Sequence, residues 1–388
     1  MKKTLSIFLT AAMLLSLAAC GNSAGTAPAP SESSAPASES ASESSAQSNA
    51  PTAREWASTD DAFDPLQESD AITFEDMRAK FGAIPKVSGD LKFAGNVKAF
   101  ENVVWREIAN GYVGLSEAAK AGGINLTVDT TSPQGENDEE GQLTILKDQV
   151  RQGVNAILLS PISDGNCLPA VDSAHEANIP VFSVNNEFNG ADYFVGPNAL
   201  SQGELAAAWV NEKLGGSGKV AIVMGMPKTG VTRNRTAGFE NWFKANGSAI
   251  EVVEKQNADW DRSKAKDIAQ TWLKMHPDLK AIFCNNDVMA LGVVEAVKEA
   301  GLKLNEDIYV VGCDGQSEAY DSIKAGEMAA TIDSFPYYEG YMGAEVALRV
   351  LAGQDIPKVV WTPCKILDST NVNNDAATNV GWSDPTFE

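Results

Sequence analysis

The chain has 388 residues, 44% of them hydrophobic, with 52 acidic and 30 basic side chains and a formal net charge of −22. This length allows two or three domains that each bury a core, so a single small module is excluded. The negative charge disfavours binding to phosphate backbones, and we expect no nucleic-acid partner. The only histidines are His175 and His276, too few for the common multi-histidine sites, and we expect neither a metal nor a cofactor.

Residues 1–19 have the organisation of a secretory signal peptide, with two lysines before an apolar stretch that is too short to span a membrane comfortably. The small residues before Cys20 resemble the lipobox of bacterial lipoproteins, which implies cleavage before Cys20 and lipidation of its thiol. We therefore expect an extracytoplasmic protein that is anchored to the cell membrane by lipidated Cys20. The alternative is an ordinary signal peptide with an incidental cysteine.

Residues 20–53 are expected to form a disordered tether that carries the lipidated cysteine. Gly21–Ala50 consist mainly of Ser, Ala, Glu and Pro without an aromatic or branched aliphatic residue, and such a segment cannot bury enough apolar surface to offset its ordering entropy. Residues 54–89 then form an N-terminal extension with one short helix, because Thr73–Asp76 has the order of a helix N-cap and Gly82 follows as a stop.

From residue 90 onward, short apolar runs alternate with longer stretches of helical periodicity. The expected strands are Phe93–Val97, Asn125–Val128, Ala156–Ser160, Pro180–Val184, Tyr193–Val195, Lys219–Met224, Ile250–Glu254, Ala281–Cys284 and Tyr309–Cys313. The expected helices include Val104–Ala121, Gln142–Gln152, Cys167–Ala177, Gln202–Leu214, Arg233–Asn246, Arg262–Met275, Met289–Ala300 and Glu318–Gly326. Continuous apolar strands that are each followed by an amphipathic helix indicate parallel sheets covered on both faces. We predict an α/β fold with two similar lobes, since these strands are too many for one comfortable open sheet.

Several short motifs occur in this region in a definite order. They are Ala156–Pro161, Ala177–Val181, Arg235–Phe239, His276–Asp278, Asn286–Gly292, Val310–Gly315 and Ala330–Ile332. Together they resemble the ribose- and galactose-binding family of bacterial periplasmic sugar receptors, the substrate-binding subunits of ABC importers, from about Leu91 to Ser369. The resemblance implies the type 1 periplasmic binding protein fold, in which two Rossmann-like lobes with parallel sheets are joined by a three-strand hinge and close over the ligand.

Carried onto this chain, the resemblance places the hinge crossovers near Gly196–Asn198, Ser334–Phe335 and Cys364–Ile366. Residues 90–197 plus 335–364 would then form the first lobe, and residues 198–334 plus 365–388 the second. We also expect the protein to be a monomer.

Polar side chains follow the predicted strands at their carboxyl ends, where open parallel sheets bind ligands. They are Asn185, Asn186, Asn286 and Asp314. A sugar needs such groups, because a desolvated hydroxyl without a partner costs roughly 1–3 kcal/mol. It also needs flat apolar surfaces, which Trp105 and Trp260 could supply from opposite lobes.

The resemblance implies a set of ligand contacts at matching positions. They are Asn102, Trp105, Asn185, Arg235, Trp260, Asn286 and Asp314. Arg235 and Asp314 can bind vicinal hydroxyls by charge-assisted hydrogen bonds while neutralising each other. The alternative roles are structural: Asn185 or Asn286 could cap the following helix, and either tryptophan could belong to the core.

Secondary candidates for ligand contact are Lys98, Ser160, Asn186, Arg233 and Ser334. Lys98, Ser160, the Asn185–Asn186 pair and Ser334 differ from the residues usual in ribose receptors, so strict ribose specificity is not expected. Lys98 could recognise an acidic group or lie on the rim of the cleft, and we expect the rim. The acidic stretch Glu136–Glu140 lacks the order of a calcium loop and is expected to be a solvated loop.

Cys167, Cys284, Cys313 and Cys364 form no C-x-x-C pair, which argues against zinc and thioredoxin-like sites. Cys284 and Cys313 end two predicted strands, so a disulfide between them is one alternative and buried free thiols the other.

The leading hypothesis is a lipid-anchored receptor that binds a monosaccharide, a hexose or pentose or a related polyol, and delivers it to an ABC permease in the membrane. The alternative is a sensor that presents the bound sugar to a membrane histidine kinase or chemoreceptor. A glycosidase that uses Asp259 or Asp314 is a third hypothesis. Because no nucleophile and base are paired in the sequence, we predict that the protein is not an enzyme.

Overall fold

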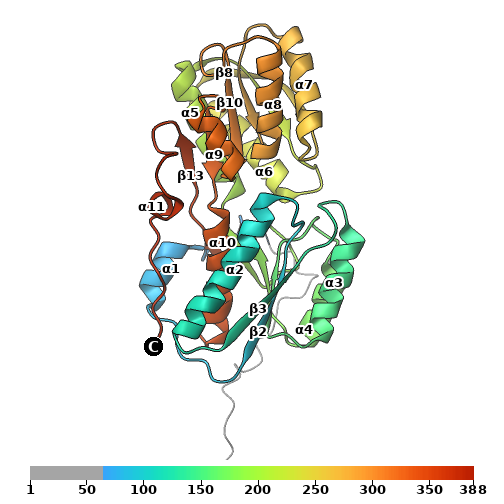
Figure 1. Ribbon diagram of the computed structural model, residues 1–388, viewed down its shortest axis with the longest axis vertical. Coiled ribbons are helices and arrows are strands. Elements are labelled where there is room, and N and C mark those ends of the chain that lie inside the picture. The colour runs from blue at the N-terminus through green and yellow to red at the C-terminus, as the bar shows by residue number, and fades with distance from the viewer. Residues whose placement is uncertain (1–63) are drawn as a thin grey trace, which may run out of the picture. The chain divides into compact units, whose positions relative to one another are not determined.

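The computed structural model describes residues 64–388. The expected signal peptide, Cys20 and the tether lie outside the described residues. Within residues 64–388 the chain forms two sheets, each with helices on both faces (Figure 1). The predicted α/β fold with two lobes is confirmed.

The first lobe is built on a seven-stranded, fully parallel sheet with the strand order β1-β12-β6-β5-β4-β2-β3. Its strands are β1 (Ile72–Thr73), β2 (Leu91–Asn96), β3 (Leu126–Thr131), β4 (Ala156–Leu159), β5 (Val181–Val184), β6 (Tyr193–Gly196) and β12 (Val359–Trp361). Its helices are α1 (Phe74–Phe81), α2 (Val103–Ala121), α3 (Glu139–Arg151), α4 (Leu168–Glu176) and α10 (Pro336–Leu351). α2 and α10 cover one face of the sheet, and α3 and α4 cover the other.

The second lobe has a six-stranded sheet with the order β13-β11-β10-β9-β7-β8, in which only β13 runs antiparallel. Its strands are β7 (Ser217–Met224), β8 (Ala249–Asn257), β9 (Leu279–Cys284), β10 (Tyr309–Asp314), β11 (Ala330–Asp333) and β13 (Lys365–Asp368). Its helices are α5 (Ala199–Leu214), α6 (Gly230–Ala245), α7 (Arg262–Met275), α8 (Asp287–Glu299) and α9 (Ser317–Lys324). α5 and α6 pack on one face, and α7 and α8 on the other.

The chain passes between the two sheets in three places, which are the connections from β6 to α5, from β11 to α10 and from β12 to β13. At the second passage Phe335 has φ 55°, a left-handed conformation just before Pro336 begins α10. α10 was not among the predicted helices. Nearly all of its residues are buried, and Glu345 and Arg349 pair with each other inside the protein.

The region around α1 and the C-terminal tail meet on the first lobe. The predicted short helix is α1, and its N-cap Thr73 accepts a hydrogen bond from Asp76 N at 3.1 Å. Residues 365–388 were expected in the second lobe: β13 and Val372 do lie there, but the tail after them packs on the first lobe. After α11 (Ala376–Val380), Phe387 bridges to Ile84 and Trp382 packs on Tyr338. The aromatic side chains of the tail bury apolar area there that would otherwise face water.

Two further findings concern the cysteines and the helices of the described residues. All four of its cysteines, Cys167, Cys284, Cys313 and Cys364, are free thiols, so the disulfide alternative does not hold. Among residues 64–388, no helix has both the length and the apolar composition that a membrane crossing requires.

Candidate ligand-binding pocket

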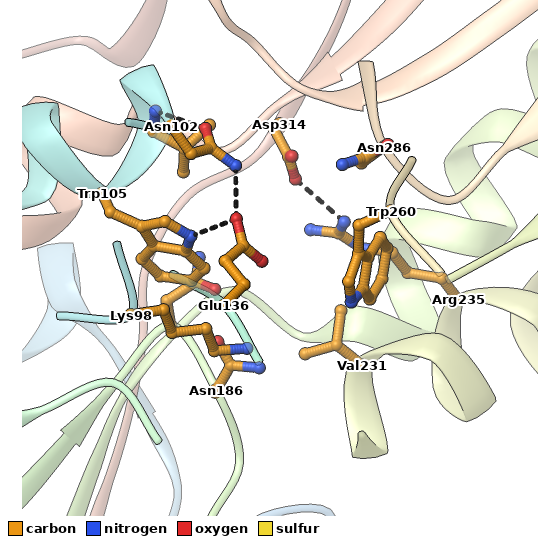
Figure 2. A pocket seen from close by; sticks show the side chains of 12 residues that line it. Lys98, Asn102, Trp105, Glu136, Asn186, Val231, Arg235, Trp260, Asn286 and Asp314 are labelled. Atoms are coloured by element: carbon orange, nitrogen blue, oxygen red, sulfur yellow. Dashed lines mark hydrogen bonds and ion pairs between the residues drawn. The ribbon is translucent and has the colours of Figure 1, made fainter. Parts of the chain in front are cut away.

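One pocket lies between the carboxyl-terminal ends of strands from the two sheets (Figure 2). It is lined by Lys98, Asn102, Val104, Trp105, Glu136, Asn185, Asn186, Val231, Arg235, Trp260, Asn286 and Asp314. The lining contains every residue predicted as a primary ligand contact and, from the secondary candidates, Lys98 and Asn186. The position agrees with the rule that open parallel sheets bind ligands beyond the ends of their strands.

The first lobe contributes Asn102 and Trp105 from the start of α2. Asn102 caps this helix, because its Oδ1 accepts from Val104 N at 3.0 Å, while its Nδ2 donates to Glu136 Oε1 at 2.7 Å. Trp105 donates from Nε1 to the same oxygen at 2.9 Å. Trp105 is also buried against the core of this lobe. Asn102 and Trp105 therefore each have a structural role and also line the pocket.

Lys98 follows β2 and lies inside the pocket, not on its rim, with only 3% of the residue exposed. The expectation of a rim position is wrong, because side chains of both lobes cover the end of this strand. Its ammonium lies 5.0 Å from the centre of the Trp105 ring. Burial lowers the pKa of Lys98 to about 8, since the charged form loses its hydration.

Asn185 and Asn186 follow β5 and are both buried. Asn185 has φ 70°, and its Nδ2 donates to Glu339 Oε2 at 3.0 Å. Burial raises the pKa of Glu339 to about 8, because the charged carboxylate loses its hydration. Asn186 Oδ1 has no hydrogen-bond partner within residues 64–388 and is available to a ligand.

The second lobe contributes an ion pair. Arg235 on α6 donates from Nη1 to Asp314 Oδ1 at 2.9 Å, and from Nε to Gln202 Oε1 at 2.8 Å. Arg235 is 3% and Asp314 is 9% exposed. Burial raises the pKa of Asp314 to about 6, although Arg235 favours its charged form. Desolvation makes these hydrogen bonds strong and specific, provided that both partners stay paired.

Trp260 closes the other side of the pocket, before α7. It has φ 65°, in the left-handed region, and follows Asp259, which has φ 54°. Gly225 is required beneath it, because a Cβ atom on that residue would lie 2.1 Å from the indole ring. Asn286 caps α8 by accepting from Met289 N at 2.9 Å, and its residual polar groups face the pocket.

The remaining secondary candidates lie outside the lining. Ser160 donates to Val184 O at 2.9 Å, and Ser334 donates to the backbone oxygen of Asp314 at 3.3 Å. The Arg233 side chain is 55% exposed and pairs with Asp164 of the first lobe at 2.8 Å.

Three residues of the lining were missed in the sequence. Val104 and Val231 lie in the first turns of α2 and α6, where apolar residues read as ordinary core positions. Glu136 belongs to the acidic stretch interpreted as a solvated loop, and this interpretation is wrong for Glu136 because its carboxylate enters the pocket.

The pocket combines two indole rings with amide, carboxylate, guanidinium and ammonium groups. Within residues 64–388, no cluster of His, Cys, Asp and Glu side chains is suited to hold a metal ion. The arrangement suits reversible binding of a small molecule that has apolar faces and many hydroxyl groups.

Known proteins are similar to this chain in sequence. The periplasmic binding protein domain family matches residues 96–355. The ribose import binding protein of Bacillus subtilis (strain 168) is 34% identical over 255 residues, which cover 65% of this chain and 80% of the relative. The D-allose-binding periplasmic protein of Escherichia coli (strain K12) is 30% identical over 289 residues, which cover 72% of this chain and 90% of the relative.

Solved structures share the fold. An ABC transporter periplasmic solute binding protein of Actinobacillus succinogenes 130z, with bound D-allose, has a TM-score of 0.67 and 28% identity over 74% of this chain and 100% of its own. A solute binding protein of Agrobacterium vitis, with bound D-fucose, has a TM-score of 0.67 and 27% identity over 74% of this chain and 99% of its own. The chain therefore belongs to the periplasmic binding protein family, and it is a binding protein, not an enzyme.

Proposed function

We propose that this protein is the extracytoplasmic substrate-binding component of an ABC importer, and that it binds a monosaccharide, a hexose or pentose or a related polyol. Its relatives include proteins named for ribose and allose, and a solved neighbour carries D-allose. The bound sugar would be delivered to a membrane permease. Lipidated Cys20 would hold the protein at the membrane, as the motif before this residue suggests.

The observation that carries the proposal is the position of two indoles on opposite sides of a polar pocket. Trp105 comes from the first lobe and Trp260 from the second, and the polar groups lie between them (Figure 2). A sugar ring has two faces with C–H groups and a rim of hydroxyls. Stacking of the faces on indoles and hydrogen bonding of the rim would satisfy both parts of such a ligand at once.

Ligand entry requires the lobes to separate. Asn185, Arg235 and Asn286 are each at most 7% exposed, so a sugar cannot reach them while the lobes remain in this arrangement. Three side-chain contacts join the lobes outside the pocket lining: Asn234 with Glu187, Arg233 with Asp164, and Lys228 with Glu139. We infer that binding proceeds by hinge closure, in which a ligand shifts the population toward the closed state.

A thermal-shift screen with pentoses, hexoses, cyclitols, acidic sugars and nucleosides tests the proposal. A ligand at one hundred times its dissociation constant stabilises the folded chain by about 2.7 kcal/mol. Titration calorimetry then gives the affinity of each hit, and recovery of the unaltered sugar checks that nothing is hydrolysed. If no monosaccharide or polyol raises the melting temperature while another class of solute does, the proposal is wrong.

A further inference from the structure

The loop between β3 and α3 brings a carboxylate into the pocket. Glu136 Oε1 accepts hydrogen bonds from Trp105 Nε1 at 2.9 Å and from Asn102 Nδ2 at 2.7 Å. Figure 2 shows the second carboxylate oxygen turned away from Trp105, toward the middle of the pocket. Glu136 is therefore part of the pocket wall, and it holds the indole and the amide in one orientation.

The position of Glu136 is supported from within its own loop. Asp138, the N-cap of α3, accepts from Gly141 N at 3.0 Å and from Gln134 N at 3.1 Å. The next residue, Glu139, pairs with Lys228 of the second lobe. The loop is thus tied down on both sides of Glu136, and the carboxylate does not depend on the ligand for its placement.

The pocket contains two cations and two anions. Lys98 and Glu136 come from the first lobe, and Arg235 and Asp314 from the second. Arg235 and Asp314 neutralise each other at 2.9 Å. Glu136 is the remaining anion and therefore balances the charge of Lys98.

The positive charge of Lys98 is stabilised by Glu136. Its ammonium is buried over the ring of Trp105, and within residues 64–388 it forms no hydrogen bond or ion pair with another side chain. The attraction of Glu136 opposes the effect of burial, which lowers the pKa of Lys98. The same indole contacts both groups, since Glu136 accepts from its Nε1.

We propose that Glu136 determines the charge of the ligand that this pocket accepts. With Glu136 in place, an uncharged sugar or polyol enters a desolvated space whose charges already cancel. An acidic sugar would bring a third negative charge beside Glu136 and Asp314, and the two cations of the pocket are already balanced by these two carboxylates. The inference rests on the proposed sugar-binding function and makes it more specific: the substrate class is neutral, although a buried lysine lines the site.

The test compares the full chain with its Glu136→Gln variant. The amide oxygen of Gln can still accept from Trp105 and Asn102, but the negative charge is gone. The probes are the neutral sugars D-ribose, D-allose, D-glucose and D-galactose and the acids D-glucuronate and D-galacturonate, measured by calorimetry at neutral pH. Glu140→Gln is the matched control, because it removes one exposed acidic charge from the same region without a contact in the pocket.

We expect the parent and the Glu140→Gln variant to prefer a neutral sugar. Glu136→Gln should keep the affinity for that sugar within about tenfold, since a neutral acceptor replaces a charged one. Its affinity for the acids should rise at least about tenfold, because the like-charge repulsion is relieved. Glu136→Ala should lose affinity for the neutral sugar by a larger factor than Glu136→Gln, because the indole is no longer held.

Different results separate the two proposals. A parent chain that prefers an acid overturns the role of Glu136 but leaves sugar binding intact. The role also fails if Glu136→Gln keeps the selectivity of the parent, or if Glu140→Gln changes the selectivity as much. A parent chain that binds none of these sugars but binds another class of solute contradicts the proposed function, and the inference falls with it.

Discussion

Asn234 on α6 of the second lobe donates a hydrogen bond from Nδ2 to Glu187 Oε2 of the first lobe, at 2.6 Å. The other oxygen of this carboxyl is buried without a partner within residues 64–388. Burial raises the pKa of Glu187 to about 7. A contact that joins the lobes thus includes a carboxyl group whose burial raises its pKa in this arrangement.

This contact predicts that acid favours closure. Glu187 has a raised pKa in the closed arrangement, and its pKa should return toward the ordinary value of 4.5 when the lobes separate. Between these values the closed form binds the proton and the open form does not, so closure gains stability as pH falls through 7 and loses it as pH rises above 7. The groups around Glu187 are Asp64, Asp164, Arg233 and Asn234.

Calorimetric titration of the identified sugar at pH 5.5 and pH 8 checks this prediction. We expect tighter binding at the lower pH, by up to about tenfold. In the Glu187→Gln variant the pH dependence should shrink, because the amide does not titrate. Equal pH dependence in both proteins would assign the effect to other groups, and tighter binding at pH 8 would contradict it.

The sequence predicted those parts of the site that depend on regular structure. The end of a continuous apolar run predicts where a strand ends, and parallel strands place their carboxyl ends at the same edge of a sheet. Asn286 and Asp314 directly follow such strands, so their meeting in one pocket could be anticipated. Arg235 lies on helix α6 and Trp260 in the turn before α7, and both were identified through the resemblance to sugar receptors.

The missed features depend on contacts between distant segments. Lys98 is buried in a pocket that second-lobe residues also line. The sequence around Lys98 does not indicate how close the other lobe lies, so this burial could not be predicted. Glu136 turns into the pocket from an irregular loop that Asp138 holds by a hydrogen bond. In such a loop the side chains do not alternate in a regular way, so the sequence does not predict which of them point inward. Nearly all residues of α10 are buried, and it therefore lacks the exposed polar face by which a surface helix is identified.

Trp260 should be the stacking partner with the larger effect on affinity, because it faces the pocket and is not part of a lobe core to the same extent as Trp105. Trp260→Ala should weaken binding of the identified sugar by about 2 kcal/mol or more, the scale of a binding hot spot. Ligand should also change the tryptophan fluorescence of the parent. Trp242→Phe is the control, since this side chain lies on α6 outside the pocket lining. A folded Trp260→Ala variant that binds within a factor of two of the parent would remove Trp260 from the site.

Cys20 should carry the lipid anchor. Cys20→Ala is expected to leave the precursor unprocessed or to release the protein into the medium, because the thiol is the group that would be lipidated. Membrane fractionation and intact-mass measurement of the mature chain check this. Normal processing together with unchanged membrane retention in the variant would contradict the assignment.

Asp314 should be the polar contact whose loss is most costly. Asp314→Asn removes the charge that pairs with Arg235, and it leaves a guanidinium that is 3% exposed without a full countercharge. Asp314 would also accept hydrogen bonds from the hydroxyls of the sugar, and a hydrogen bond to a charged group is worth about 1.5–3 kcal/mol, so we expect binding to weaken about tenfold or more.

Glu318→Gln is the control for this change. Glu318 lies four residues further on, on α9, and pairs with Arg262 on the surface at 2.7 Å, so its substitution should leave affinity unchanged. Small-angle scattering of the parent with and without the sugar should show a smaller radius of gyration on binding, because closure brings Asp314 of the second lobe up to ligand that Asn102 and Asn185 hold in the first. Asp314→Asn should need far more sugar for the same compaction. An unchanged radius of gyration at saturating sugar would reject the closure mechanism. If the variant becomes compact at the same sugar concentration as the parent, Asp314 is not needed for closure.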